Sequence, residues 1–152
     1  MALEIEHKFL VNGDSYKWEA SGKQEIIQGY LSRDPERTVR VRVRDDKAFI
    51  TIKGKGTGGT ARPEFEYEVP LEDALEMIKL CLPPIIVKTR YIVMHEGNRW
   101  EVDEFKGNLQ GLVIAELEVP SEDYFFNLPQ FVGLEVTGDP RYYNANLGCS
   151  EV

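Results

Sequence analysis

The chain has 152 residues, of which 42% are hydrophobic and 29% are charged, a composition close to that of average globular proteins. Its formal net charge of −8 disfavours a general nucleic-acid or anionic-membrane surface, and no apolar run approaches the roughly 20 residues of a membrane span. One folded domain over residues 1–152 is expected, without a secretory signal. Cys81 and Cys149 are too few for a disulfide framework, so reduced thiols and a cytoplasmic setting are expected.

The commonest local pattern is an alternation of apolar and polar residues, closed by Gly, Asp or Asn, which predicts short β-strands. In chain order the strands are expected at 3–11, 24–31, 38–44, 48–55, 64–69, 86–95, 99–105, 113–119 and 134–137. Residues 45–47 and 96–98 are expected to form tight turns, and 54–59 a mobile hairpin loop. Short links of this kind join antiparallel strands.

Helices are expected to be few. A short helix is predicted at 14–20 and a longer one at 71–82, where apolar residues recur at helical spacing. Ser121 is a good N-cap for a helix over 121–126, and residues 139–147 begin with Asp and Pro, a favourable helix start. The predicted fold class is therefore α+β, dominated by antiparallel sheet.

The polar positions of the predicted strands are almost all charged. Side chains two apart on a strand point the same way, so each strand has one apolar and one ionic face. Several ionic faces carry a single sign: that of 38–44 is cationic and that of 64–69 is anionic. The ionic faces together hold six cations, Lys8, Arg40, Arg42, Lys53, Lys88 and Arg90, and seven carboxylates, Glu4, Glu6, Glu64, Glu66, Asp103, Glu116 and Glu118.

Two architectures fit this pattern. In one, the apolar face of an open sheet packs on helices and the ionic face is simply solvated. In the other, the sheet closes into a barrel with helices packed outside, and the charges line a water-filled lumen. Like charges on one face repel, so strands of a single sign favour a ligand that needs both signs. A metal-chelated polyphosphate is such a ligand, because its phosphates bind cations and its metal binds carboxylates.

The segment Glu4-Ile-Glu6-His7-Lys8 resembles the Glu-x-Glu-x-Lys signature of the CYTH superfamily, the triphosphate tunnel metalloenzymes. His7 stands where many relatives carry Arg, on the outward face of its strand. Eight further segments resemble family blocks in family order, and together they span the chain. These are residues 28–31, 39–42, 51–53, 64–66, 87–91, 102–105, 115–118 and 139–144.

The resemblance implies a closed eight-stranded antiparallel β-barrel, a tunnel that binds triphosphate through Lys and Arg and Mg²⁺ or Mn²⁺ through Glu and Asp. The length is similar to that of the short bacterial members, which implies hydrolysis of inorganic tripolyphosphate to pyrophosphate and phosphate. Nucleoside or thiamine triphosphate hydrolysis, adenylyl cyclase activity and non-catalytic polyphosphate binding remain alternatives. A small polyphosphate is the expected partner, without nucleic acid or membrane, and the oligomeric state, a homodimer included, stays open.

Roles for individual residues follow from the resemblance and from their chemistry. Glu6 and Glu118 are expected to take part in catalysis, with Glu118 orienting and deprotonating the attacking water and Lys53 or Lys88 as the alternative general base. The expected metal ligands, for one or two ions, are Glu4, Glu6, Asp103, Glu116 and Glu118. The expected phosphate ligands are Lys8, Arg40, Arg42, Lys53, Lys88 and Arg90.

Four further residues are candidates for supporting roles. Tyr30 is expected to donate to phosphate or to lie in the core. Glu64 and Glu66 are expected to hold the cationic side chains or to support the metal. The last predicted helix is expected to cover one end of the tunnel, from which Arg141 would reach inward.

Two sequence features are interpreted as structural. The segment 54–59 is rich in glycine but lacks the Gly-Lys-Ser/Thr ending and the following helix of a Walker A motif, so a hairpin loop is expected. Trp18 and Trp100 are both expected to pack in the core or against helices.

Overall fold

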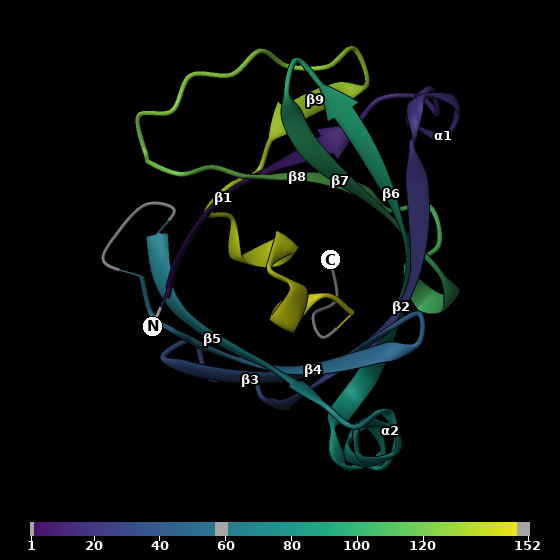
Figure 1. Cartoon of the computed structure of the whole chain (residues 1–152), viewed down its shortest axis with the longest axis vertical. Coiled ribbons are helices and arrows are strands. Elements are labelled where there is room, and N and C mark those ends of the chain that lie inside the picture. The colour runs from purple at the N-terminus through teal and green to yellow at the C-terminus, as the bar shows by residue number, and fades with distance from the viewer. Residues whose placement is uncertain (1, 57–60, 149–152) are drawn as a thin grey trace.

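The computed structural model describes residues 2–56 and 61–148, which form an antiparallel barrel. The strand order is β5-β4-β3-β2-β6-β7-β8-β1-β9, and an additional β5–β1 pairing closes the first eight strands into a ring. Figure 1 shows this ring of strands end-on. The predicted closed eight-stranded barrel is therefore confirmed. Strand bounds are β1 Ala2–Val11, β2 Gly22–Ser32, β3 Arg37–Arg44, β4 Lys47–Gly54, β5 Ala61–Val69, β6 Leu82–His95, β7 Asn98–Phe105, β8 Val113–Glu118 and β9 Val132–Glu135.

The two α-helices and the first 3₁₀ turn lie outside the barrel wall. They are α1 (Tyr16–Glu19) and α2 (Leu71–Leu80), both predicted, and the 3₁₀ turn η1 (Gly107–Leu109). Among the described residues α2 is the longest helix, with 10 residues, and none is long and apolar enough to cross a bilayer. The predicted turn at 96–98 is also present, because Glu96 and Gly97 have φ of 49° and 79°, as a two-residue type I′ hairpin requires.

The apolar strand faces point outward and are covered by the helices and by the long loop before β9. Val41, Val43 and Ala48 pack on Ala74 of α2. On the opposite wall, Trp100 is fully buried in a larger cluster of outward-facing residues. Two of the hydrophobic clusters therefore lie between the barrel and its coverings, while the ionic faces share the interior with a third cluster that includes Ile86, Phe105 and Ile114.

Trp18 was expected to be buried and is not: it lies on α1 with 77% of its surface exposed. The helix has four residues, so it presents only one side to the barrel. Tyr16 takes that side, is buried, and packs edge-on against Tyr91 and Phe131. The prediction for Trp18 was wrong because a helix this short buries only one of its two aromatic residues.

The predicted helix at 121–126 is absent, and this segment is irregular. Tyr124 and Phe126 are two residues apart and stack on each other, with ring centroids 6.5 Å apart, which is the periodicity of extended chain. Phe126 packs on Phe9 and Trp100, while Tyr124 Oη donates to Asn98 Oδ1 at 2.7 Å. Aromatic packing on the outer wall of the barrel outweighs the capping tendency of Ser121.

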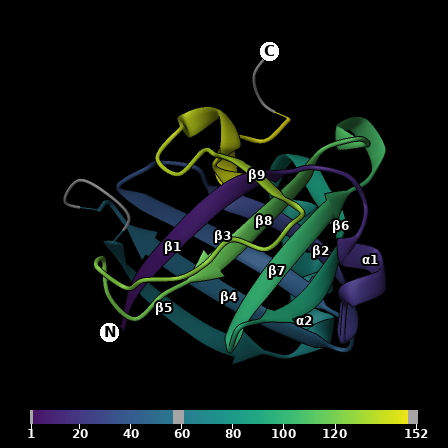
Figure 2. The ribbon, with the colours of Figure 1, turned by 90° about the horizontal axis from the view of Figure 1, so that it is seen from above.

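The last predicted helix, at 139–147, is replaced by two 3₁₀ turns, η2 (Pro140–Tyr142) and η3 (Asn144–Asn146). Tyr143 is extended, with ψ of 132°, and separates them. This break lets Leu147 bury against Ile86, Phe105 and Ile114 at the end of the barrel. Figure 2 shows the segment lying across that end, as expected for a cover, although it is not an α-helix.

Candidate active site

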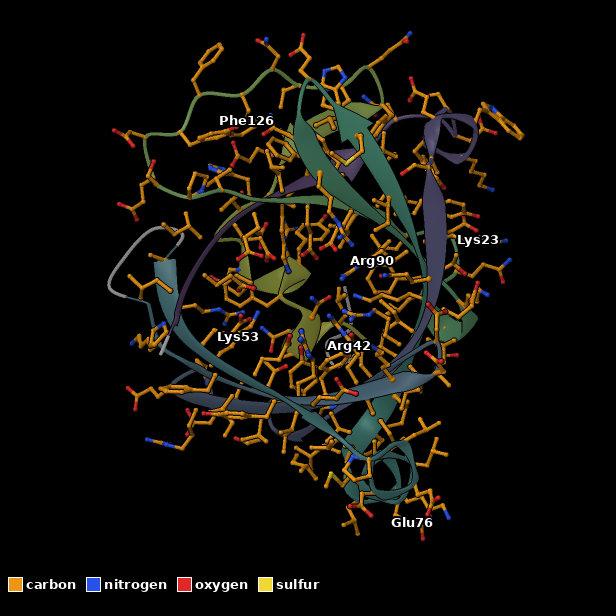
Figure 3. All side chains as sticks on the ribbon, in the orientation of Figure 1. Lys23, Arg42, Lys53, Glu76, Arg90 and Phe126 are labelled. Atoms are coloured by element: carbon orange, nitrogen blue, oxygen red, sulfur yellow. The ribbon has the colours of Figure 1, made fainter. Side chains whose placement is uncertain are left out.

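A cavity of about 600 Å³ lies between the inner wall of the barrel and the C-terminal segment. The sequence-predicted residues that line it come from β1 to β4, and they are Glu4, Glu6, Lys8, Tyr30, Arg40 and Lys53. Tyr143, Asn144 and Asn146 form the wall that the C-terminal segment contributes. The ionic faces therefore surround an enclosed space, and they do not form an open, flat solvated surface. Figure 3 shows Lys53, Arg42 and Arg90 pointing inward, whereas Lys23, Glu76 and Phe126 lie outside.

The first ion-pair cluster of the cavity joins β1, β4 and β5. Lys53 Nζ lies 2.7 Å from Glu4 Oε1 and 3.6 Å from Glu64 Oε2. Arg62 Nε lies 3.8 Å from the same Glu4 oxygen. Antiparallel register explains the cluster, because Lys53 pairs with Glu64 and Glu4 pairs with Arg62 across neighbouring strands.

A second group surrounds Arg40 on β3. Its Nη2 atom donates to Thr51 Oγ1 at 3.1 Å and lies 3.5 Å from Glu66 Oε2. Thr51 Oγ1 in turn donates to Glu66 at 2.8 Å. Glu66 thus holds Arg40 in place from the partly exposed side.

Deeper in the barrel, Asp103 on β7 binds two cations of β6. Lys88 Nζ lies 2.6 Å from Asp103 Oδ2, and Arg90 donates from Nε to Oδ1 at 2.7 Å and from Nη2 to Oδ2 at 2.9 Å. Arg90 Nη1 also lies 3.3 Å from Glu101 Oε1. Both oxygens of Asp103 are therefore engaged by cations.

Burial and the neighbouring charges shift the pKa values of Lys88 and Asp103. Burial lowers the pKa of Lys88 to about 7, although the charge of Asp103 acts in the opposite direction, and Arg90 and Arg42 lower it further. Burial alone would raise the pKa of Asp103, but Arg90 and Lys88 outweigh it and hold that pKa at about 2. Burial thus lowers the pKa of the Lys88 amine toward neutrality, beside a carboxylate whose pKa is depressed.

Arg42 occupies the next inward position of β3 after Arg40. Its Nε and Nη2 atoms donate to Oε1 of Gln28, at 2.9 and 2.7 Å. Burial, together with Arg40 and Arg90, lowers the pKa of Arg42 to about 9. Three guanidinium groups from β3 and β6 therefore act on one another inside the barrel.

The carboxylates of β1 and β8 crowd one another. Register places Glu6 opposite Glu118 and Lys8 opposite Glu116. Burial, then Glu116 and Glu4, raise the pKa of Glu6 well above its ordinary range. Burial would also raise the pKa of Glu116, but Lys8, a hydrogen bond with Glu6 and the deeper cations hold it well below that range. Burial, Glu4 and Glu64 raise the pKa of Glu118.

This donor set fits a hard divalent cation. Glu4, Glu6, Glu116 and Glu118 offer only oxygen atoms, which Mg²⁺ and Mn²⁺ prefer. Burial is the main cause of the raised pKa of Glu6, and the neighbouring carboxylates Glu116 and Glu4 raise it further, so added positive charge is favourable here. Within residues 2–56 and 61–148, no three Asp, Glu, His or Cys side chains are already close enough to bind one ion together. To bind one ion together, these carboxylates would have to move closer to one another.

The structure brings together twelve of the thirteen charged side chains predicted to face inward, in the cavity, in its ion-pair clusters or in the deeper network. Glu118 lies at the exposed end of β8, within electrostatic reach of Glu4. Arg141 does not reach inward: its side chain is exposed and forms an ion pair with Asp139 at 2.7 Å. Because Asp139 also accepts from the backbone N–H of Arg141, the η2 turn directs this side chain outward.

Several site residues were missed by the sequence reasoning. Arg62 has the same parity as Glu64, but Pro63 interrupts the pattern, so β5 was expected to begin later. Glu101 has the same parity as Asp103 but lies near the start of its strand, so it was not counted among the inward carboxylates, although it contacts Arg90. Gln28 carries no charge, so a search for charged positions passed over it despite its matching parity. Arg33 lies in the loop after β2, where alternation has no meaning, and it lines the cavity.

Two further expectations are tested outside the cavity. His7 does face outward: its Nδ1 lies 2.8 Å from Glu135 Oε2, and its ring packs on Phe126. Cys81 is a free thiol, as expected, whereas Cys149 lies outside the described residues. Residues 57–59 of the predicted hairpin loop also fall outside them.

The closed barrel with an ionic interior is the architecture of the CYTH domain, and the CYTH domain model matches residues 2–143. The chain therefore belongs to the CYTH family. It is 51% identical over 148 residues to an inorganic triphosphatase of Acetivibrio thermocellus, covering 97% of this chain and 94% of the relative. It is 33% identical over 156 residues to an inorganic triphosphatase of Nitrosomonas europaea, covering 97% of each.

Solved structures agree with this assignment. A crystal structure of an inorganic triphosphatase is similar with a TM-score of 0.67 and 31% identity, covering 97% of this chain and 99% of that one. A protein from Pyrococcus horikoshii OT3 is similar with a TM-score of 0.62 and 25% identity, covering 79% of this chain and 80% of that one.

Proposed function

We propose that this chain is a metal-dependent inorganic triphosphatase, which hydrolyses tripolyphosphate to pyrophosphate and phosphate inside the barrel. The observation that carries the proposal is the convergence of cations from β1, β3, β4 and β6 with carboxylates from β1 and β8 on one interior. Relatives at 51% and 33% identity that are inorganic triphosphatases support the same reaction. Residues 1–152 act as one domain, with a small polyphosphate as partner and neither nucleic acid nor membrane, and the expected setting is cytoplasmic.

The cations bind and align the phosphate chain. Lys8, Arg40 and Lys53 line the cavity, and Arg42 and Arg90 lie behind them. In phosphoryl transfer, charge spreads over the oxygens of the transferred group, so fixed and desolvated cations stabilise the transition state more than they would in water. Tyr30 is buried and lines the cavity, where its hydroxyl can donate to a phosphate oxygen.

Four carboxylates, Glu4, Glu6, Glu116 and Glu118, hold the divalent metal that this family implies, and Mg²⁺ or Mn²⁺ suits their oxygen donors. When bound, the metal neutralises phosphate charge and acts as a Lewis acid toward the reacting phosphoryl group. Asp103, which was expected among the ligands, is proposed instead to hold Lys88 and Arg90, because both of its oxygens are engaged by them. Glu64 and Glu66 hold Lys53 and Arg40.

Lys88 is proposed as the general base. With a pKa of about 7 it is partly neutral at physiological pH, so Nζ could accept the proton of a water that reached it from the cavity, whose lining residues do not include Lys88. The water oxygen then forms a bond to the terminal phosphorus, and the bond from that phosphorus to its bridging oxygen breaks. Pyrophosphate leaves with the electron pair of that bond. Lys53 and Glu118 remain the alternatives, with Glu118 orienting the water from the open end of the barrel.

A substrate panel tests the proposal. Tripolyphosphate, ATP and pyrophosphate are compared under one Mg²⁺ and pH condition, with Mn²⁺ as a second series. A linear triphosphate can engage more of the inward cations than pyrophosphate can, and ATP adds a nucleoside. The expected order of kcat/KM is tripolyphosphate, ATP, pyrophosphate, with a first step of at least about tenfold, or about 1.4 kcal/mol. If ATP matched or exceeded tripolyphosphate, a nucleoside triphosphatase would replace the proposal.

A further inference from the structure

Arg42 differs from the other inward cations in its partners. In the described part of the chain, each of the other five has a carboxylate within 4.0 Å: Lys8 has Glu116, Arg40 has Glu66, Lys53 has Glu4, and Lys88 and Arg90 have Asp103. No such pair involves Arg42 among these residues. Its side chain is nevertheless buried, with 7% of its surface exposed.

The group that replaces a carboxylate is the amide of Gln28. Gln28 on β2 stands directly opposite Arg42 on β3 in the strand register. Its side chain is fully buried, and its single oxygen accepts from both Nε and Nη2. A guanidinium only donates, so these contacts fix which end of the amide faces Arg42. Gln28 therefore fixes the plane of the guanidinium as a carboxylate would, but without neutralising its charge.

We propose that Gln28 is a positioning residue that orients Arg42 toward the substrate while keeping its positive charge uncompensated. This inference rests on the proposed function, because the missing counter-charge is supplied by the polyphosphate. A guanidinium has five N–H groups. Two are taken by Gln28, so the second hydrogen of Nη2 and both hydrogens of Nη1 are left for phosphate oxygens.

An unsatisfied atom supports the same assignment. Nε2 of Gln28 is buried and has no hydrogen-bond partner among the described residues. A buried amide without a partner is costly, and such a group in a native structure calls for an explanation, such as a water or an ion that occupies the site. An oxygen-rich anion beside Arg42 offers the acceptor that Nε2 lacks.

The electrostatics explain why a neutral residue is needed at position 28. Arg40 and Arg90 both act unfavourably on Arg42, and Asp103 is already engaged by Lys88 and Arg90. A glutamate at position 28 would relieve this repulsion in the empty protein. It would also neutralise the charge of Arg42, which no carboxylate of the described residues compensates within 4.0 Å and which a polyanion would meet, so stability and substrate affinity would change in opposite directions.

The test uses Gln28→Glu, Gln28→Met and the surface control Gln110→Met. Gln28→Glu keeps the shape and adds a charge, so we expect KM for tripolyphosphate to rise at least about tenfold, which is about 1.4 kcal/mol, without a lower melting temperature. Gln28→Met removes the hydrogen bonds, so we expect KM to rise while kcat changes less. Gln110→Met should leave both constants unchanged.

A double-mutant cycle with Arg42→Ala separates positioning from packing. The rise in KM caused by Gln28→Met should vanish in the Arg42→Ala background, because no guanidinium is left to orient. If Gln28→Met raised KM equally in both backgrounds, or if Gln28→Glu left KM unchanged, the inference would be overturned while the triphosphatase assignment stood.

The reverse failure is also recognisable. If the unmodified protein failed to hydrolyse tripolyphosphate, the proposed function would fail. Calorimetric titration of the same variants with tripolyphosphate would still decide the role of Gln28. Weaker binding by Gln28→Glu and Gln28→Met would support it, and unchanged binding would refute it.

Discussion

Lys88 Nζ lies 2.6 Å from Asp103 Oδ2, and both side chains are fully shielded from solvent. The same carboxylate also binds Arg90, so one negative charge serves two cations. Breaking such a buried pair from one side leaves an uncompensated charge, which is costly. The ion pair fixes the position of Lys88, while burial lowers the pKa of its amine.

Replacing Lys88 with Met should reduce kcat strongly and KM little. Methionine fills a similar volume, and Arg90 still neutralises Asp103, so the fold should survive. Loss of a general base typically lowers turnover by about 10²–10⁴. Steady-state kinetics of Lys88→Met are compared with the control Lys106→Met, because the side chain of Lys106 is exposed and forms an ion pair with Glu25 outside the barrel. A kcat within about threefold of that of the unmodified protein would mean that Lys53 or Glu118, and not Lys88, is the general base.

The same lysine predicts a pH profile. Its pKa is depressed from the ordinary value of 10.5 to about 7, and the neutral form is the base. Turnover should therefore be low at acid pH, rise as pH passes through about 7, and level off above it. The measurement is kcat against pH with tripolyphosphate at saturation. The rising limb should disappear in Lys88→Met, and its persistence there would assign it to another group.

Glu6→Gln tests the metal site. Glutamine keeps the size of the side chain but removes a charged oxygen donor from the carboxylate cluster. Turnover should fall by about 10²-fold or more, while tripolyphosphate still binds through the cations. Calorimetry with Mg²⁺ or Mn²⁺ should show weaker metal binding than in Glu76→Gln, an exposed control on α2. Unchanged metal affinity would remove Glu6 from the ligand set.

Ligands should stabilise the fold. The inward carboxylates repel one another: after burial, Glu116 and Glu4 are what raise the pKa of Glu6. At a hundredfold excess over Kd, a ligand adds about 2.7 kcal/mol. For a domain of this size that corresponds to roughly 5–10 °C in Tm. Thermal unfolding with and without Mg²⁺ and tripolyphosphate measures the shift, which should be smaller in Glu6→Gln. Equal Tm values at saturation would argue against the site.

The two tryptophans should respond differently to substitution. Trp100 is fully buried and packs on Phe9 and Phe126, so Trp100→Ala should lower the free energy of unfolding by about 3–5 kcal/mol. Trp18 is 77% exposed, so Trp18→Ala should change it by no more than about 0.5 kcal/mol. Urea denaturation of both variants gives the comparison. A large loss in Trp18→Ala would mean that α1 packs more tightly than its exposure indicates.

The sequence predicted the strands and their inward faces well because alternation is a direct consequence of strand geometry. Parity alone placed Glu4, Arg40 and Lys88 on the ionic faces of their strands, and the family resemblance predicted that the sheet closes around those faces. Alternation carries no information about segments that are not strands. The exposure of Trp18 and the conformation of residues 121–126 depend on which aromatic side chains pack on the outer wall of the barrel. That packing is determined by the tertiary structure and not by the local sequence.

Within the site, the sequence revealed which residues are charged but not how they share partners. Asp103 could be expected to bind metal, and only the register of β6 against β7 shows that Lys88 and Arg90 both reach it. Gln28 was missed for a related reason: its role comes from standing opposite Arg42, and a neutral amide gives no signal in a search for charge. Pairings across strands, which single-strand periodicity does not encode, determine the chemistry.

Strand β1 pairs with β5 through residues 2–5, with β8 through residues 6–10 and with β9 near its end. Its principal partner is thus more than a hundred residues away in the chain, and contacts of such sequence separation form slowly because a long loop must close first. During synthesis β1 cannot form its pairing with β8 until β8 has left the ribosome. Glu4, Glu6 and Lys8 all lie on this strand, so the pairing that closes the ring also completes the candidate active site. A partly synthesised chain therefore keeps these residues apart from their partners on β8.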